Sequence, residues 1–180
     1  SDLIKLPEDI SEQALLQQIR ELNNRKDIHG ILVQLPLPKH IDEDKVIQTI
    51  SPEKDVDGFS PISVGKMMLG QDTYLPCTPY GVMKLLEHSG IDVAGKHAVI
   101  VGRSHIVGKP MGQLLLQKDA TVTYTHSKTP DLPSFTKQAD ILIAAVGRAN
   151  FITSEHIKEG AVIIDVGINR DEENHLCGDV

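Results

Sequence analysis

Two glycines that could cradle a phosphate group stand at Gly102 and Gly108. The apolar run 97–101 precedes them, and a helix is expected to start at the second glycine. Glycines let a backbone approach a pyrophosphate closely, and a helix N-terminus offers free N–H groups and a positive dipole end. Ser104 stands where the G-x-G-x-x-G fingerprint has its second glycine, so the spacing departs from that pattern. The order of strand, turn and helix still favours a dinucleotide site that includes Arg103 and Ser104 over a purely structural turn.

The end of the next expected strand, 121–125, bears on which dinucleotide would bind. An NAD site usually carries an acidic residue about 20 residues after the glycines. Here the strand is followed by Ser127 and Lys128, and by no carboxylate. Both side chains can donate to a 2′-phosphate, and Arg103 adds a nearby cation. The sequence therefore favours NADP as the cofactor, with a merely solvated Lys128 as the alternative.

Two further glycines follow expected strands. Gly147 comes after the run 141–145, and Gly167 comes after the run 161–166. Ligands of open α/β sheets bind at the carboxyl ends of strands. Each glycine could also serve only a tight turn, but the place that they share favours a functional role.

The first part of the chain is expected to alternate helix and strand. Ser11 is a suitable N-cap for a helix with one apolar face. The mostly apolar run 30–35 is suited to a buried strand that Pro36 stops. A short helix is expected at 42–50. The first domain is assigned to residues 1–78.

The second part of the chain, residues 79–180, has a regular rhythm of strands and helices. It opens with a helix for which Thr78 is the expected N-cap, Pro79 the first residue and Gly90 the C′ residue. Strands are expected at 97–101, 121–125, 141–145 and 161–166. Strands that alternate with helices predict a parallel sheet covered on both faces. The fold class is therefore α/β, with a partial N-terminal α/β domain followed by a Rossmann-like domain.

Composition excludes several classes of function. The chain has 180 residues, 40% of them hydrophobic, and a net charge of −7 with 3% aromatic residues. A nucleic-acid binder would show a basic patch and aromatic stacking platforms, which this composition lacks. No apolar run approaches the roughly 20 residues of a membrane span. Cys77 and Cys177 form neither a disulfide framework nor a metal-ligand pattern, so we expect no metal site and a reducing, cytoplasmic compartment.

Several motifs in this order resemble the bifunctional methylenetetrahydrofolate dehydrogenase/cyclohydrolase family, and the resemblance covers essentially the whole chain. The specificity comes from the number of motifs and their order. They are Gln34-Leu35-Pro36-Leu37-Pro38, Asp55-Val56-Asp57-Gly58, Pro76-Cys77-Thr78-Pro79, Gly102-Arg103-Ser104, Gly108-Lys109-Pro110, Asp165-Val166-Gly167-Ile168-Asn169 and Gly178-Asp179-Val180.

The resemblance implies roles for individual residues. Asp57 matches the aspartate that holds the pterin ring, although its place before Gly58 also suits a plain turn residue. Gln34 matches the glutamine that orients the catalytic lysine; otherwise it is a strand-end residue that reaches water. Cofactor contacts are implied for the remaining matched positions, which are Thr78, Arg103, Ser104, Ser127 and Ile168.

The resemblance also implies an activity, which is oxidation of 5,10-methylenetetrahydrofolate with NADP⁺ and hydrolysis of the methenyl product, in a homodimer. The family's catalytic lysine, in a Tyr-x-x-x-Lys motif, and a later Pro-Gly-Gly-Val-Gly-Pro segment are absent, so we expect the 180 residues alone to bind cofactor without turnover. We expect them to be a fragment of a longer protein, which would be active. Tyr80 and Lys84 reproduce the spacing on a different segment. Two alternatives stay open, namely another NADP-dependent dehydrogenase of shikimate type and a nucleotide-binding module without turnover.

Overall fold

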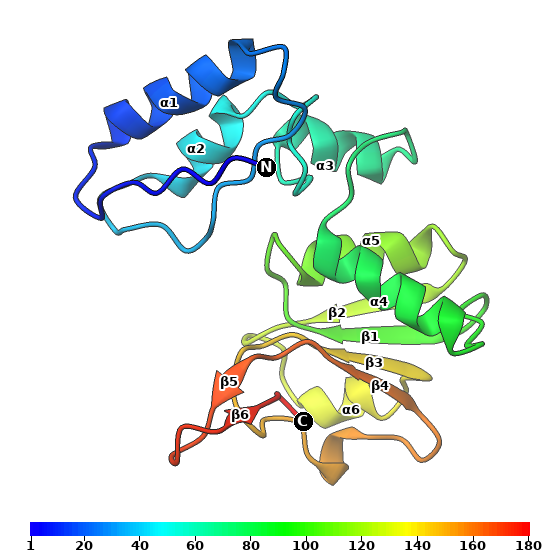
Figure 1. Ribbon diagram of the computed structural model, residues 1–180. Coiled ribbons are helices and arrows are strands. Elements are labelled where there is room, and N and C mark those ends of the chain that lie inside the picture. Colours follow the sequence, from blue (N-terminus) through cyan, green and yellow to red (C-terminus); the bar gives the residue numbers. More distant parts are fainter. The chain divides into compact units, whose positions relative to one another are not determined.

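Three helices and the loops between them form the first unit of the chain, Ser1–Leu75, in the computed structural model, which describes residues 1–180 (Figure 1). The helices are α1 (Glu12–Asn24), α2 (Glu43–Thr49) and α3 (Pro61–Met68). A polar side chain caps each start: the side chains of Ser11, Asp42 and Ser60 accept the N–H of the residue three positions later. Capping satisfies donors that a helix start leaves without a partner. The helices expected after Ser11 and at 42–50 are confirmed, whereas α3 was not predicted.

The strand expected at 30–35 does not form. Ile31 makes one isolated parallel bridge to Asp55, with its N–H donating to the Lys54 carbonyl at 2.8 Å. A strand needs a ladder of such bonds on its neighbour, and here the neighbouring segment offers only one. Leu32 is 58% exposed, so the apolar run is not buried as predicted. The core of this unit instead consists of Leu15, Ile19, Ile31, Ile41, Val46 and Ile50.

A four-stranded parallel sheet organises the second unit, Pro76–Val180. Its strands are β1 (His97–Val101), β2 (Thr121–Thr125), β3 (Ile141–Ala144) and β4 (Val162–Asp165), in the order β2-β1-β3-β4. All four predicted strands are confirmed, with ends that differ by at most one residue. A short antiparallel pair follows, formed by β5 (Asn169–Arg170) and β6 (Leu176–Cys177).

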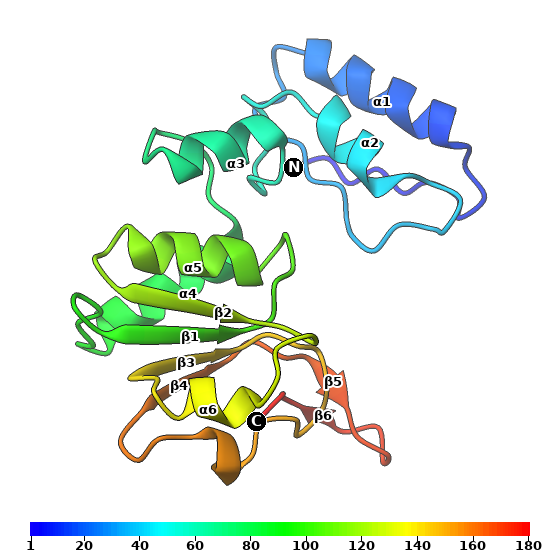
Figure 2. The same ribbon diagram turned by 180° about the vertical axis from the view of Figure 1, so that it is seen from behind.

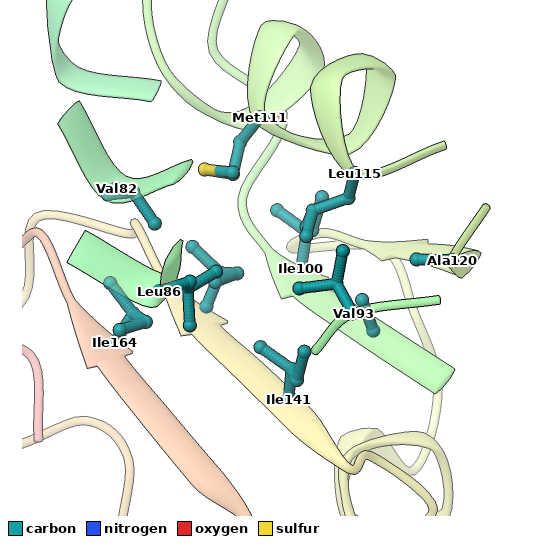
Figure 3. Close-up of a cluster of buried hydrophobic side chains, with 11 residues drawn as sticks. Val82, Leu86, Val93, Ile100, Met111, Leu115, Ala120, Ile141 and Ile164 are labelled. Atoms are coloured by element: carbon teal, nitrogen blue, oxygen red, sulfur yellow. The ribbon is translucent and has the colours of Figure 1, made fainter. Parts of the chain in front are cut away.

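Helices cover both faces of this sheet, as predicted. Helices α4 (Cys77–His88) and α5 (Gly108–Leu116) lie on one face, and α6 (Leu132–Thr136) and the 3₁₀ helix η1 (Ser154–His156) lie on the other (Figure 2). Alternate residues of a strand serve opposite faces. Ile100 therefore joins Leu86 and Leu115 in the core under α4 and α5 (Figure 3), whereas Val99 belongs to the core on the α6 side.

Helix α4 differs from the prediction at its N-terminal end only. The helix starts at Cys77, after Pro76, so Thr78 lies in the first turn and is not the N-cap. The reason is that the Pro76 carbonyl already accepts the first helical hydrogen bond, from the N–H of Tyr80 at 3.0 Å. Gly90 is the C′ residue, as predicted. It has φ +68°, and its N–H donates to the Glu87 carbonyl at 3.1 Å in a Schellman arrangement.

Candidate functional site

The turn after β1 brings two glycines into close contact. Gly102 has φ +129°, and a Cβ there would overlap the Ala145 carbonyl oxygen. A Cβ on Gly108 would lie 2.6 Å from the Gly102 carbonyl oxygen. Contacts this short leave room only for glycine at both positions. The backbone therefore folds tightly at the carboxyl end of β1, where open α/β sheets bind their ligands.

Ser104 caps the start of α5. Its hydroxyl oxygen accepts the N–H groups of Val107 and Gly108, both at 3.2 Å. Its carbonyl accepts the N–H of Lys109 at 3.0 Å. The expectation of free N–H groups at the first turn of α5 is therefore wrong, because the chain itself uses them. The serine in place of the fingerprint's second glycine has this capping role.

Donors for an anion remain in the turn itself. The backbone N–H groups of Arg103, His105 and Ile106 make no hydrogen bond within the chain, and all three residues are exposed. These groups stand next to the positive end of the α5 dipole. A phosphate could therefore bind at the turn rather than at the helix start.

The ends of β1 and β2 lie side by side. Val101 pairs with Thr125, so Arg103 and Ser127 leave the same edge of the sheet two residues later. A tight turn follows β2, in which the N–H of His126 donates to the Thr129 hydroxyl at 2.9 Å. Ser127 is exposed, as is the adjacent Lys128. This edge presents a guanidinium, a hydroxyl and an ammonium group, and no carboxylate follows β2.

The ends of β3 and β4 are joined by a residue that sequence reasoning did not select. The carboxylate of Asp179 is fully buried and accepts the N–H groups of Val146, Gly147 and Arg148 at 2.6, 3.1 and 2.8 Å. Burial raises the pKa of Asp179, but the hydrogen bonds from Asn169 and from this turn outweigh it, so the pKa lies below its ordinary value. Its one sequence signal was the motif match at 178–180.

The two remaining cofactor candidates are solvent-exposed. Ile168, in the loop after β4, is 83% exposed. Thr78 is exposed in the first turn of α4. An apolar side chain that is open to solvent at a strand end is available to a ligand.

In the first unit, two neighbouring aspartates have different environments. Asp55 is buried, and its carboxylate accepts the N–H of Ser60 and the hydroxyl of Ser63, both at 2.8 Å. Asp57 is half-buried and its side chain accepts no hydrogen bond within the chain. Burial, and then the Asp55 carboxylate, raise the pKa of Asp57. The Asp57 carboxylate is therefore free for an external donor.

Gln34 is exposed, and its side-chain amide donates to the Leu35 carbonyl at 2.9 Å. It lines a pocket of about 920 Å³ within this unit, together with Val56 but without Asp57. Lys84, which has the spacing of a catalytic lysine, is exposed on α4 and forms an ion pair with Glu87 at 2.7 Å. That pairing gives Lys84 an ordinary surface role.

Two further features of the structure concern metals and membranes. No group of three or more His, Cys, Asp or Glu residues is placed to hold a metal ion. None of the helices combines the length and the apolar character that a bilayer crossing demands.

Comparison with known families gives matches over most of the chain. Residues 76–180 match the NAD(P)-binding domain of tetrahydrofolate dehydrogenase/cyclohydrolase, and residues 1–57 match the catalytic domain of the same enzymes. The bifunctional protein FolD of Lysinibacillus sphaericus is 84% identical over 180 residues, which is 100% of this chain and 63% of the relative. The FolD of Geobacillus kaustophilus is 65% identical over the same length.

Solved structures agree with these matches. The bifunctional FolD of Campylobacter jejuni is 52% identical with a TM-score of 0.95, over 97% of this chain and 62% of that one. The Trypanosoma brucei methylenetetrahydrofolate dehydrogenase-cyclohydrolase, solved in complex with NADP cofactor and inhibitor, is 39% identical with a TM-score of 0.91, over 98% of this chain and 63% of that one. The chain thus spans less than two thirds of the length of the relatives that it matches.

Proposed function

The chain belongs to the tetrahydrofolate dehydrogenase/cyclohydrolase family, and from this membership we propose that the protein oxidises 5,10-methylenetetrahydrofolate with NADP⁺ and hydrolyses the methenyl product to 10-formyltetrahydrofolate. A hydride leaves the methylene carbon in the first step, and NADP⁺ accepts it. Water adds to the methenyl cation in the second step. Because the chain spans 63% of its relatives' length, both activities are proposed for the whole protein.

The tight approach of Gly102 and Gly108 is the observation that carries the dinucleotide half of this proposal. Neither position has room for a Cβ, and the turn between them keeps unbonded N–H groups for a pyrophosphate. Arg103, Ser127 and Lys128 would hold the 2′-phosphate, and no carboxylate follows β2 to repel it. The remaining cofactor contacts are assigned to Thr78, Ser104, Gly147 and Ile168.

The folate half of the proposal depends on Asp57. A carboxylate without an internal partner can accept two parallel N–H bonds from the 2-amino-pyrimidinone edge of a pterin. Burial and the Asp55 charge disfavour the ionised form of Asp57. A donor that pairs with the carboxylate would offset both effects. Gln34 is assigned to the catalytic centre as an orienting amide. We assign folate binding to residues 1–78 and nucleotide binding to residues 79–180.

Equilibrium titration of the whole protein tests the proposal. We expect binding of NADPH, followed by the fluorescence of the reduced nicotinamide, with a preference over NADH, and binding of 5,10-methenyltetrahydrofolate. Another dehydrogenase, of shikimate type, would bind NADPH but no folate. A module without turnover would bind NADPH weakly and likewise no folate. Absence of NADPH binding would overturn the whole assignment.

Asp57→Ala in the whole protein separates the folate site from the cofactor site. Loss of hydrogen bonds to a charged group costs about 1.5–3 kcal/mol, so folate affinity should fall roughly 10- to 150-fold while NADPH affinity stays unchanged. Asp72→Ala is the matched control, because Asp72 is an exposed loop carboxylate of the same unit. Unchanged folate affinity in Asp57→Ala would remove Asp57 from the site.

We also propose that the protein is a homodimer of the cytoplasm. Both cysteines are free, which suits a reducing compartment. Light scattering at micromolar concentration tests the dimer, and a mass of 19.7 kDa for the chain would contradict it.

A further inference from the structure

The fully buried carboxylate of Asp179 has neither a lysine nor an arginine as its partner. Four N–H donors compensate its charge instead, three from the consecutive backbone positions 146–148 and one from the Asn169 amide at 2.9 Å. A buried charge without such bonds would be strongly destabilising. Three consecutive donors that converge on one carboxylate fix the conformation of the turn that they belong to, in which Gly147 has φ +65°.

Asp165, the last residue of β4, holds the backbone of Asp179 in turn. Its carboxylate accepts the N–H groups of Gly167, Asp179 and Val180 at 2.8, 3.0 and 3.1 Å. A Cβ on Gly178 would overlap the Asp165 carboxylate, and a Cβ on Gly167 would overlap that of Asp179. The two aspartates and two glycines therefore interlock the turn after β3 with the loop after β4.

The interlocked turn is continuous with the glycine turn after β1. Ala145 directly precedes the three clamped residues, and its carbonyl oxygen is the atom against which Gly102 packs. Its N–H donates to the Val101 carbonyl at 2.9 Å. A shift of the turn at Val146 would therefore move the Ala145 carbonyl that packs against Gly102. The contact between Gly102 and Gly108 would change with it.

We propose that Asp179 is a positioning residue of the dinucleotide site, whose carboxylate holds the turn 146–148 and, through Ala145, the Gly102 turn in the conformation that binds the cofactor. Being fully buried, Asp179 acts through these turns and does not touch the ligand. The inference rests on the proposed function, since it assumes a dinucleotide at this edge of the sheet.

The test variant is Asp179→Asn in the whole chain. The amide replaces one acceptor oxygen by an NH₂ group, which would face backbone N–H donors and push the turn away. We expect NADPH affinity to fall about tenfold or more, because small displacements of positioning groups have effects of this size. Amide hydrogen exchange without ligand should become faster at 145–148 and at 102–108.

Asp140→Asn is the matched control for general loss of stability. Asp140 precedes β3 at its opposite end, where its carboxylate accepts the His97 N–H at 3.0 Å and the Lys158 ammonium at 2.6 Å. Its loss should leave NADPH affinity within about twofold. An equal loss of affinity in both variants, or NADPH affinity within twofold of wild type in Asp179→Asn, would overturn the positioning role.

A milder variant covers the case in which Asp179→Asn does not fold. Asn169→Ala keeps the carboxylate and removes one of its four bonds, so NADPH affinity should fall about threefold; no change would overturn the inference. Failure of the proposed function has a different signature, which is wild-type chain that does not bind NADPH. In that case hydrogen exchange still tests whether the turn 146–148 is coupled to the Gly102 turn. Unchanged exchange at 102–108 in the variants would refute this coupling.

Discussion

Replacing Lys54 by methionine is expected to loosen the C-terminal end of helix α1. The ammonium group of Lys54 donates to the carbonyls of Leu22, Asn23 and Arg25 at 3.0, 2.7 and 2.7 Å. A helix end leaves its last carbonyls without partners inside the helix, although the Leu22 carbonyl also accepts the Arg25 N–H at 3.2 Å. A cation at this end also opposes the negative end of the helix dipole. Methionine keeps the length of the stem and removes the donors.

The size of the effect follows from these three bonds. A hydrogen bond to a charged donor contributes about 1.5–3 kcal/mol when it is buried, and a partly exposed carbonyl recovers part of this by bonding water. We therefore count about 1 kcal/mol for each bond and expect a loss of roughly 3 kcal/mol. Every 1.4 kcal/mol is a tenfold change in an equilibrium constant, so local opening of α1 should become roughly 100-fold more frequent.

Amide hydrogen exchange of the peptide that contains α1 measures this opening directly. Lys45→Met is the control, because Lys45 forms exposed ion pairs with Glu12 at 2.8 Å and with Asp42 at 3.8 Å. Exposed ion pairs contribute little. If ion pairs alone determined stability, Lys45→Met would be more destabilising than Lys54→Met, because Lys54 forms no ion pair. A rise of less than about fivefold in the exchange of Lys54→Met, or a larger effect of Lys45→Met, would contradict this role of Lys54.

Three other changes give separate tests. Ser127→Asp should lower the preference for NADPH over NADH by about tenfold or more, since it places a carboxylate where NAD sites have one; an unchanged ratio of the two dissociation constants would contradict our interpretation of the β2 end. Lys158 and the His97 N–H lower the pKa of Asp140 to about 2 from 3.8. Its stabilising effect is thus complete above pH 3.8 and disappears as the pH falls towards 2, so urea unfolding of wild type and Asp140→Asn should converge over that range and differ at pH 6. Leu115→Ala, in the core under α4 and α5, should destabilise the second unit by about 2–5 kcal/mol, measured by urea unfolding; a smaller loss would mean that the core closes around the gap.

The parallel sheet could be predicted because its signals are local. Strands that are buried on both faces are continuous apolar runs, and the segments 97–101 and 141–144 have no exposed residue. Turn glycines mark where such strands end, so Gly102 and Gly147 were found from the sequence. Helix α3 also has a local signal, in Ser60 as N-cap and Pro61 as first residue, which the sequence reasoning passed over.

The remaining features depend on partners far away in the sequence. The run 30–35 has the composition of a strand, but a strand also needs a neighbour, and only Asp55 provides a bridge. Lys54 looks like a loop lysine until its three carbonyl acceptors, about 30 residues earlier, are in place. Asp179 likewise receives its donors from positions 146–148. Such roles cannot be inferred from local spacing.

The structure also gives a physical reason for choosing Asp57, which the family resemblance selected, over the neighbouring Asp55. Asp55 and Asp57 share one loop, but their carboxylates have different surroundings. Asp55 is buried, and its carboxylate already accepts hydrogen bonds from Ser60 and Ser63. The buried carboxylate of Asp179 in the second unit likewise accepts hydrogen bonds from its own turn. Asp57 has no such bonds, and its burial, and then the charge of Asp55, disfavour its ionised form. An external N–H donor would satisfy Asp57 at no cost to the fold, so a ligand at this loop should bind Asp57 and leave Asp55 in place.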